Sequence, residues 1–170
     1  MELMITITIA AMLLSIAIPS FTSIIVSNRL TTYANEFVTA LNLARSESIK
    51  RGVQVTVKRK GTTSAAWENG WDVFVDSDGN NVFNDNGNAT LCEAGEDCLL
   101  RTYDALPSGY TLRTGGSAYK DYAAYLSSGL SKTSFGDTFT LCRSSGTAQR
   151  TITISSTGRA KVAVANGTCP

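Results

Sequence analysis

Oxygen-bearing side chains alternate in the segment DSDGNNVFNDNG, in a pattern that could bind a hard cation. Asp76, Asp78 and Asn80 stand at the first, third and fifth places of a calcium loop of the EF-hand type. The match ends there, because Asn81 stands where such a loop needs glycine and Gly87 where it needs a bidentate glutamate. We therefore prefer a turn rich in Asp, Asn and Gly, which tolerate left-handed backbone, and keep calcium binding as the alternative.

Four cysteines offer either disulfide bonds or a zinc site. Zinc is not favoured, because the sequence has no C-x-x-C spacing and no histidine. In an exported domain, which meets an oxidising compartment, four cysteines allow three disulfide pairings, and the sequence does not select among them. We favour Cys92 with Cys98, which closes an acidic loop, and Cys142 with Cys169, which ties the C-terminal end to a strand.

The absence of histidine also excludes most nucleophilic enzyme sites. A Ser-His-Asp or Cys-His arrangement cannot form, and no glycine-rich phosphate loop follows a predicted strand. Nine acids lie between Glu68 and Asp104 with Arg101 as the one base, but carboxylates in a loop are usually solvated rather than placed for proton transfer. We expect neither an enzyme nor a cofactor. The net charge of +1 gives no overall attraction to nucleic acid.

The elements that position these residues begin with a charge-free run of 26 residues, Leu3 to Asn28. A helix needs about 20 apolar residues to cross a bilayer. A cleaved secretory signal would have a basic start and a shorter apolar core, and a buried helix would show a polar stripe, which the hydroxyl residues here do not form. We predict a transmembrane helix segment over residues 1–28, kinked at Pro19 because proline cannot donate to the carbonyl of Ser15.

The helical pattern continues over residues 29–52 as an amphipathic half. Lys50 and Arg51 complement the exposed carbonyls of its last turn, and Gly52 can take the left-handed cap. The whole helix would measure some 75 Å at about 1.5 Å per residue, so its outer half must pack on another element. Small or apolar residues recur on one face at spacings of four and three: Leu30, Ala34, Phe37, Leu41, Ala44 and Ser48.

Residues 53–170 are expected to form a globular antiparallel β domain. No second long helical pattern occurs, so the fold class is α+β, with a long N-terminal helix packed on antiparallel sheet. Alternating apolar residues predict strands at 53–60, 71–78, 99–105, 110–114 and 138–143, and a hairpin at 150–164 with its turn at 156–159. Loops rich in Gly, Ser, Asn and Asp are expected at 76–98, 115–136 and 144–149.

Several of these features together resemble the GspH/FimT family of type IV minor pilins and type II secretion pseudopilins. They are Glu2 before a charge-free helix, Pro19 two-thirds along it, the segment ALNLARSESIKRG at the helix end, and strands closing on SSTGRAK. The resemblance implies a type IV pilin-like fold and a single-pass protein of the bacterial inner membrane with a periplasmic domain. It also implies processing and N-methylation by a prepilin peptidase, and packing with other pilins through the N-terminal helix into a pilus or pseudopilus.

The same resemblance gives Glu2 an assembly role. In the family, this glutamate lies in the apolar filament core and attracts the N-terminal amine of a neighbouring subunit. Family members carry a short basic leader before it, whereas Met1 alone precedes Glu2 here. We therefore expect the true start to lie further upstream, with a chain that cannot be processed as the alternative, and we assign no processing site.

Three functions follow from the resemblance. The leading one is a minor pilin that takes part in pilus assembly or initiation near the tip. The second is DNA binding during uptake for natural transformation, because some FimT-type relatives are linked to DNA through a C-terminal G-R-x-R motif. Gly158, Arg159, Ala160 and Lys161 match that motif except for the last residue, and Arg159 and Lys161 would share one strand face with Arg150 beside them. The third is a GspH-like pseudopilin of type II secretion.

Overall fold

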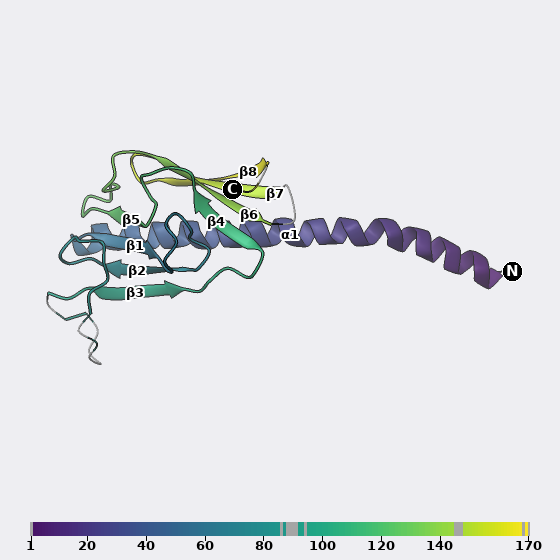
Figure 1. Cartoon of the computed structure of the whole chain (residues 1–170), viewed down its shortest axis with the longest axis horizontal. Helices are drawn as coiled ribbons and strands as arrows, with labels where there is room; N and C mark the ends of the chain where they lie inside the picture. Colours follow the sequence, from purple (N-terminus) through teal and green to yellow (C-terminus); the bar gives the residue numbers. More distant parts are fainter. Residues whose placement is uncertain are drawn as a thin grey trace.

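A single long helix opens the chain. The structure is a computed structural model that describes residues 2–85, 87, 92–93, 95–144, 148–167 and 169, and of these it leaves out the side chains of Glu2 and residues 14–20. Helix α1 (Glu2–Arg51) contains 50 residues, and its N-terminal half extends away from the rest of the molecule (Figure 1). Gly52 has a φ of 70°, and its N–H donates to the Ser48 carbonyl at 3.0 Å. The predicted long helix and its left-handed cap are confirmed.

In the described part of the chain, eight strands form two four-stranded antiparallel sheets beside the C-terminal half of α1 (Figure 1). The α+β class expected from the sequence is therefore confirmed. Helix α1 contacts strands of both sheets. The first sheet has the order β3 (Cys98–Tyr103), β2 (Trp71–Val75), β1 (Val55–Arg59), β5 (Tyr122–Tyr125), and the second has the order β4 (Tyr110–Thr114), β6 (Asp137–Arg143), β7 (Ala148–Ile154), β8 (Ala160–Asn166).

An aromatic cluster joins the helix to both sheets. The ring of Phe37 on α1 lies edge-on to Trp67, to Trp71 of β2 and to Phe139 of β6, with centroids 5.3, 5.0 and 4.9 Å away. Such edge-to-face pairs stabilise a core beyond their buried area. The predicted apolar helix face is confirmed, because every one of its residues is fully buried: Leu30, Ala34, Phe37, Leu41, Ala44 and Ser48.

The sheets differ from the sequence-based prediction in one strand. Strand β5 lies in the segment 115–136, which was predicted to be a loop, and this prediction was wrong. Its four residues, Tyr-Ala-Ala-Tyr, are too few to show an alternating pattern, and alanine has a low strand propensity. The strand forms because β1 provides a hydrogen-bonding edge, on which Val57 pairs with Ala123 and Val55 with Tyr125.

Candidate assembly helix and basic groove

The N-terminal half of α1, residues 3–25, is here called the projecting segment. It extends beyond the sheets (Figure 1), and its described large apolar side chains are mostly more than half exposed. A contiguous apolar surface of this kind usually marks an interaction site. The most exposed of these residues are Leu3, Met4, Ile5, Ile7, Ile9, Met12, Leu13, Phe21, Ile24 and Ile25.

Thr6 and Thr8 on the projecting segment form hydrogen bonds within the helix. The Thr6 hydroxyl donates to the Leu3 carbonyl at 2.9 Å, and the Thr8 hydroxyl donates to the Met4 carbonyl at 2.7 Å. Since both donors are satisfied within the helix itself, these two threonines can enter apolar surroundings without leaving a hydroxyl donor unpaired. Among the residues whose side chains are described, no helix has both the length and the hydropathy to cross a membrane.

Arg150 of β7 anchors α1 at the point where the helix leaves the globular part. Its side chain is only 6% exposed, and its Nη2 donates to the Ser27 hydroxyl at 2.8 Å and to the Thr31 hydroxyl at 3.1 Å. The same nitrogen donates to the Ser27 carbonyl at 3.2 Å. The prediction that Arg150 belongs to a basic surface patch was wrong, because the guanidinium is buried against the helix.

Arg159 and Lys161 lie together with a cation from α1. They line an open groove of about 700 Å³, and the helix contributes Arg45 to it. No described carboxylate forms an ion pair with any of these three cations. We call this site the basic groove, lined by Asn42, Arg45, Thr153, Ser155, Arg159, Ala160 and Lys161. Arg45 was not among the predicted site residues, because only the packing of α1 against β7 and β8 brings it to the hairpin.

A tight turn presents the two hairpin cations. The Gly158 N–H donates to the Ser155 carbonyl at 2.8 Å, and Gly158 has a φ of 79°. The Tyr125 hydroxyl donates to the Gly158 carbonyl at 3.1 Å, and burial raises the pKa of Tyr125, which keeps this donor protonated. A Cβ at residue 158 would lie 2.7 Å from Cε1 of Tyr125. Both the backbone conformation and the available space therefore require glycine.

Gly158→Ala should lower the free energy of unfolding by about 2 to 5 kcal/mol. The left-handed backbone accounts for about 1 to 2 kcal/mol and the contact with Tyr125 for about 1 to 3 kcal/mol. Gly52→Ala is the matched control, because Gly52 has a similar φ of 70° but a Cβ there would have no neighbour within 4 Å. It should lose only about 1 to 2 kcal/mol. Urea unfolding of both variants measures the difference, and equal losses would contradict the close contact.

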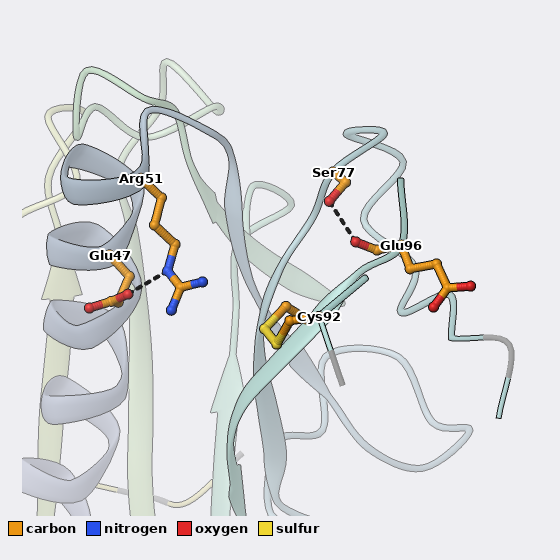
Figure 2. The surroundings of a disulfide bond; sticks show 6 residues. Glu47, Arg51, Ser77, Cys92 and Glu96 are labelled. Atoms are coloured by element: carbon orange, nitrogen blue, oxygen red, sulfur yellow. Dashed lines mark hydrogen bonds and ion pairs between the residues drawn. A yellow bond between two sulfur atoms is a disulfide. The ribbon is translucent and has the colours of Figure 1, made fainter. Parts of the chain in front are cut away.

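Both disulfide bonds favoured from the sequence are present. Cys92 is bonded to Cys98 with a Cα–Cα distance of 4.4 Å, and Cys142 is bonded to Cys169 with a Cα–Cα distance of 5.8 Å. Figure 2 shows the first bond beside the loop that joins β2 to β3, where the Ser77 hydroxyl donates to the Glu96 carbonyl at 2.7 Å. The two bonds therefore hold the β2–β3 loop and the C-terminal end of the chain.

Figure 2 also shows an ion pair at the end of α1. Arg51 Nε donates to a Glu47 carboxylate oxygen at 2.6 Å, and this hydrogen bond lowers the pKa of Glu47. Both residues lie on the helix surface four positions apart, so the pair supports the last turn of α1.

Of the three calcium ligands predicted from the sequence, Asp76, Asp78 and Asn80, the fold brings only the two aspartates into one acidic cluster. Carboxylate oxygens of Asp76 and Asp78 lie within 4.8 Å of each other and of one from Asp97, which was not among the predicted ligands. Asn80 is engaged within the loop instead: its amide oxygen accepts from the Val82 N–H at 2.6 Å, and its amide nitrogen donates to Asp78 at 2.6 Å. The acidic cluster therefore consists of three aspartates.

A long helix whose exposed apolar half projects from an antiparallel β domain defines a pilin-like protein. A family model described as Type II transport protein GspH matches residues 33–158. The chain belongs to this family, and it is a minor pilin or pseudopilin, as the sequence predicted. Subunits of this kind are structural rather than enzymatic, so the expectation that the chain is not an enzyme is confirmed.

Solved structures from both branches of the family share the fold. The type IV minor pilin FimU of Pseudomonas aeruginosa matches with 20% identity and a TM-score of 0.59, over 80% of this chain and 89% of that chain. A second crystal form of FimU gives 20% identity and a TM-score of 0.57, over 79% of this chain and 92% of that chain. The minor pseudopilin EpsH from the type 2 secretion system of Vibrio cholerae matches with 13% identity and a TM-score of 0.52, over 81% of this chain and 97% of that chain. No curated protein matches the sequence.

Proposed function

We propose that the chain is a structural subunit of a type IV pilus that takes part in pilus assembly or initiation near the tip. The observation that carries this proposal is the projecting segment, whose described large apolar side chains are exposed in the single chain. Burial of apolar surface is worth about 25 cal/mol per Å², so packing this segment against the helices of other pilins would be strongly favourable. The globular part would then lie on the outside of the filament.

The start of α1 would supply a more specific assembly contact. We propose that Glu2 attracts the N-terminal amine of a neighbouring subunit, and that Pro19 shapes the helix for packing in the filament core. A buried charge without a partner is costly, so such a pair would help to fix the register between subunits. The side chains of Glu2 and Pro19 lie outside the described part of the structure.

Before assembly, the charge-free segment would hold the chain in the bacterial inner membrane with the globular part in the periplasm. This proposal rests on the 26 residues without charge between Leu3 and Asn28. A prepilin peptidase would process and methylate the precursor. Detection of the full-length precursor in the membrane fraction, at a larger mass than the filament form, would support it, and recovery of the precursor in the soluble fraction alone would oppose it.

The pilus proposal is tested by recovery of the chain in filaments. Surface filaments are sheared from cells, and the chain is detected in them by immunoblotting, with and without a charge placed on the projecting segment. A pseudopilin of type II secretion is the alternative within the same family. In that case the chain would be absent from sheared filaments, and its loss would block the release of secreted enzymes.

A second candidate function is DNA binding at the basic groove. The observation that favours it is the meeting of Arg45, Arg159 and Lys161 from two elements, without an ion pair to a described carboxylate. Cations on the rim of an open groove can neutralise DNA phosphates. Lys161 would act as a point charge, since it lacks the bidentate fork of arginine.

Lys161→Ala should weaken DNA binding several-fold and make the dependence on salt shallower. Each phosphate contact that is lost should reduce the slope of log affinity against log salt by about 0.9. Fluorescence anisotropy of a labelled duplex with the full chain in detergent, at two salt concentrations, measures both quantities. Arg159→Ala and Arg45→Ala should behave alike.

Lys120→Ala is the matched control for DNA binding. Lys120 is exposed and does not line the basic groove, so its loss should leave the affinity unchanged. If Lys120→Ala weakens binding as much as Lys161→Ala does, or if the wild-type chain binds no DNA at low salt, the groove is not a DNA site.

A further inference from the structure

Two aspartates lie at the neck of the β2–β3 loop. Val75 of β2 pairs with Cys98 of β3, so Asp76 and Asp97 are the residues at which the two strands separate. Asp97 accepts hydrogen bonds from the Ser77 N–H at 2.8 Å and from the Asn84 N–H at 2.9 Å. Its carboxylate therefore already organises the loop that leaves β2.

Asp78 completes the acidic cluster of Asp76, Asp78 and Asp97. Their carboxylates each offer an oxygen within 4.8 Å of the others, and Asp76 and Asp97 are buried while Asp78 is exposed. Three negative charges at this separation repel one another, and burial of two of them strengthens the repulsion. The exposed Asp78 leaves the cluster open to solvent on one side.

An unsatisfied oxygen gives an independent sign of a missing partner. Asp76 is 1% exposed, and its Oδ1 is buried without a hydrogen-bond donor among the described residues. Its Oδ2, by contrast, accepts from Gln54 Nε2 at 2.6 Å, from the Thr56 hydroxyl at 2.8 Å and from the Asn81 N–H at 2.9 Å. Leaving a buried carboxylate oxygen without a partner is costly, whereas a cation would satisfy it.

Nearby lysines donate to loop oxygens rather than to the three carboxylates. Lys58 donates to the Asn81 carbonyl at 2.9 Å, and Lys132 donates to the Gly79 carbonyl at 2.7 Å and to the Asn81 amide oxygen at 3.3 Å. Among the described residues, no lysine or arginine forms an ion pair with any of the three aspartates. Within the described part of the chain, therefore, no cation contacts the three carboxylates directly.

We propose that Asp76, Asp78 and Asp97 bind one Ca²⁺ ion at the neck of the β2–β3 loop. Calcium takes carboxylate and other oxygen ligands in flexible geometry, whereas Mg²⁺ demands a near-ideal octahedron and keeps its waters. Zinc prefers nitrogen and sulfur ligands, but the chain has no histidine and its four cysteines are in disulfides. The ion would close the loop together with the Cys92–Cys98 bond shown in Figure 2. This site goes beyond the proposed function and does not depend on it.

The experiment is calorimetric titration of the full chain in detergent with CaCl₂ after treatment with a chelator. We expect one ion per chain, with a Kd of about 10⁻⁴ to 10⁻³ M, the range of extracellular calcium modules, and weaker binding of MgCl₂. The melting temperature should rise with calcium, because an ion that binds only the folded state stabilises it. Absence of binding at millimolar calcium, or equal affinity for magnesium, would overturn the proposal.

Asp78→Asn is the decisive variant, because Asp78 is exposed and its hydrogen bonds are local ones with Asn80 and Asn84. Its calcium affinity should fall at least about tenfold, while its melting temperature in chelator stays that of the wild type. Asp104→Asn removes the same charge from an exposed position outside the cluster and should bind calcium normally. Equal losses in both variants would show a general charge effect and overturn the assigned site.

Discussion

Replacing Ile9 by lysine should exclude the chain from filaments while the globular part stays folded. Ile9 lies on the projecting segment and is 53% exposed, so the substitution disturbs no contact with the core. In the proposed filament, however, the new ammonium group would face apolar helices without a counter-charge. Burying an unpaired charge costs several kcal/mol, and about 3 kcal/mol already corresponds to a loss of more than 100-fold in incorporation.

Phe135→Lys is the matched control for this prediction. Phe135 is 76% exposed on the globular part, and its replacement introduces the same charge outside the projecting segment. Immunoblots of sheared filaments should contain the Phe135 variant and lack the Ile9 variant, and circular dichroism should give both the wild-type melting temperature. Normal incorporation of Ile9→Lys would contradict the packing of this segment in a filament core.

The helix could be predicted from the sequence because its signals are local. The apolar face from Leu30 to Ser48 follows the helical repeat, and the cap at Gly52 follows two basic residues. The β7–β8 hairpin was also predicted from local alternation, and in the structure its Ile152 pairs with Val162. Patterns within a few residues decide these elements, so no knowledge of the packing was needed.

The parts that escaped prediction depend on residues far apart in the sequence. Nothing in the sequence around Arg150 distinguishes a buried arginine from an exposed one. Its side chain holds α1 only because the fold brings Ser27 and Thr31 within hydrogen-bond distance. Asp97 joins Asp76 because β2 and β3 pair, and Arg45 meets Lys161 because α1 crosses the second sheet. Periodicity specifies which face of an element is buried, but it does not specify its neighbours.

Strand β8 lies at the exposed edge of its sheet and contributes to the candidate DNA site. It is the edge strand of its sheet, none of its residues is fully buried, and it carries Lys161 of the basic groove. An edge strand with little core contact is held mainly by its hydrogen bonds to one neighbour, here β7. The bond between Cys142 of β6 and Cys169 therefore holds the chain end that follows β8 against the middle of the sheet.

Removing that bond with Cys142→Ala and Cys169→Ala together should lower the free energy of unfolding by about 3.5 kcal/mol. The two cysteines are 27 positions apart, and the loss of loop-closure entropy predicts this value. In a chain of this size, the melting temperature should fall by about 7 to 14 °C. Hydrogen exchange should also become faster at the amides of β8, because the strand can then separate from β7 locally.

The bond between Cys92 and Cys98 provides the comparison, because it spans only 6 positions. Its double alanine variant should lose about 2.2 kcal/mol by the same relation and leave exchange in β8 unchanged. A reducing agent should destabilise the wild-type chain by at least as much as either pair of substitutions. If the two double variants lose equal stability, or if exchange in β8 does not increase without the Cys142–Cys169 bond, then β7 and α1 alone hold the strand that presents Lys161.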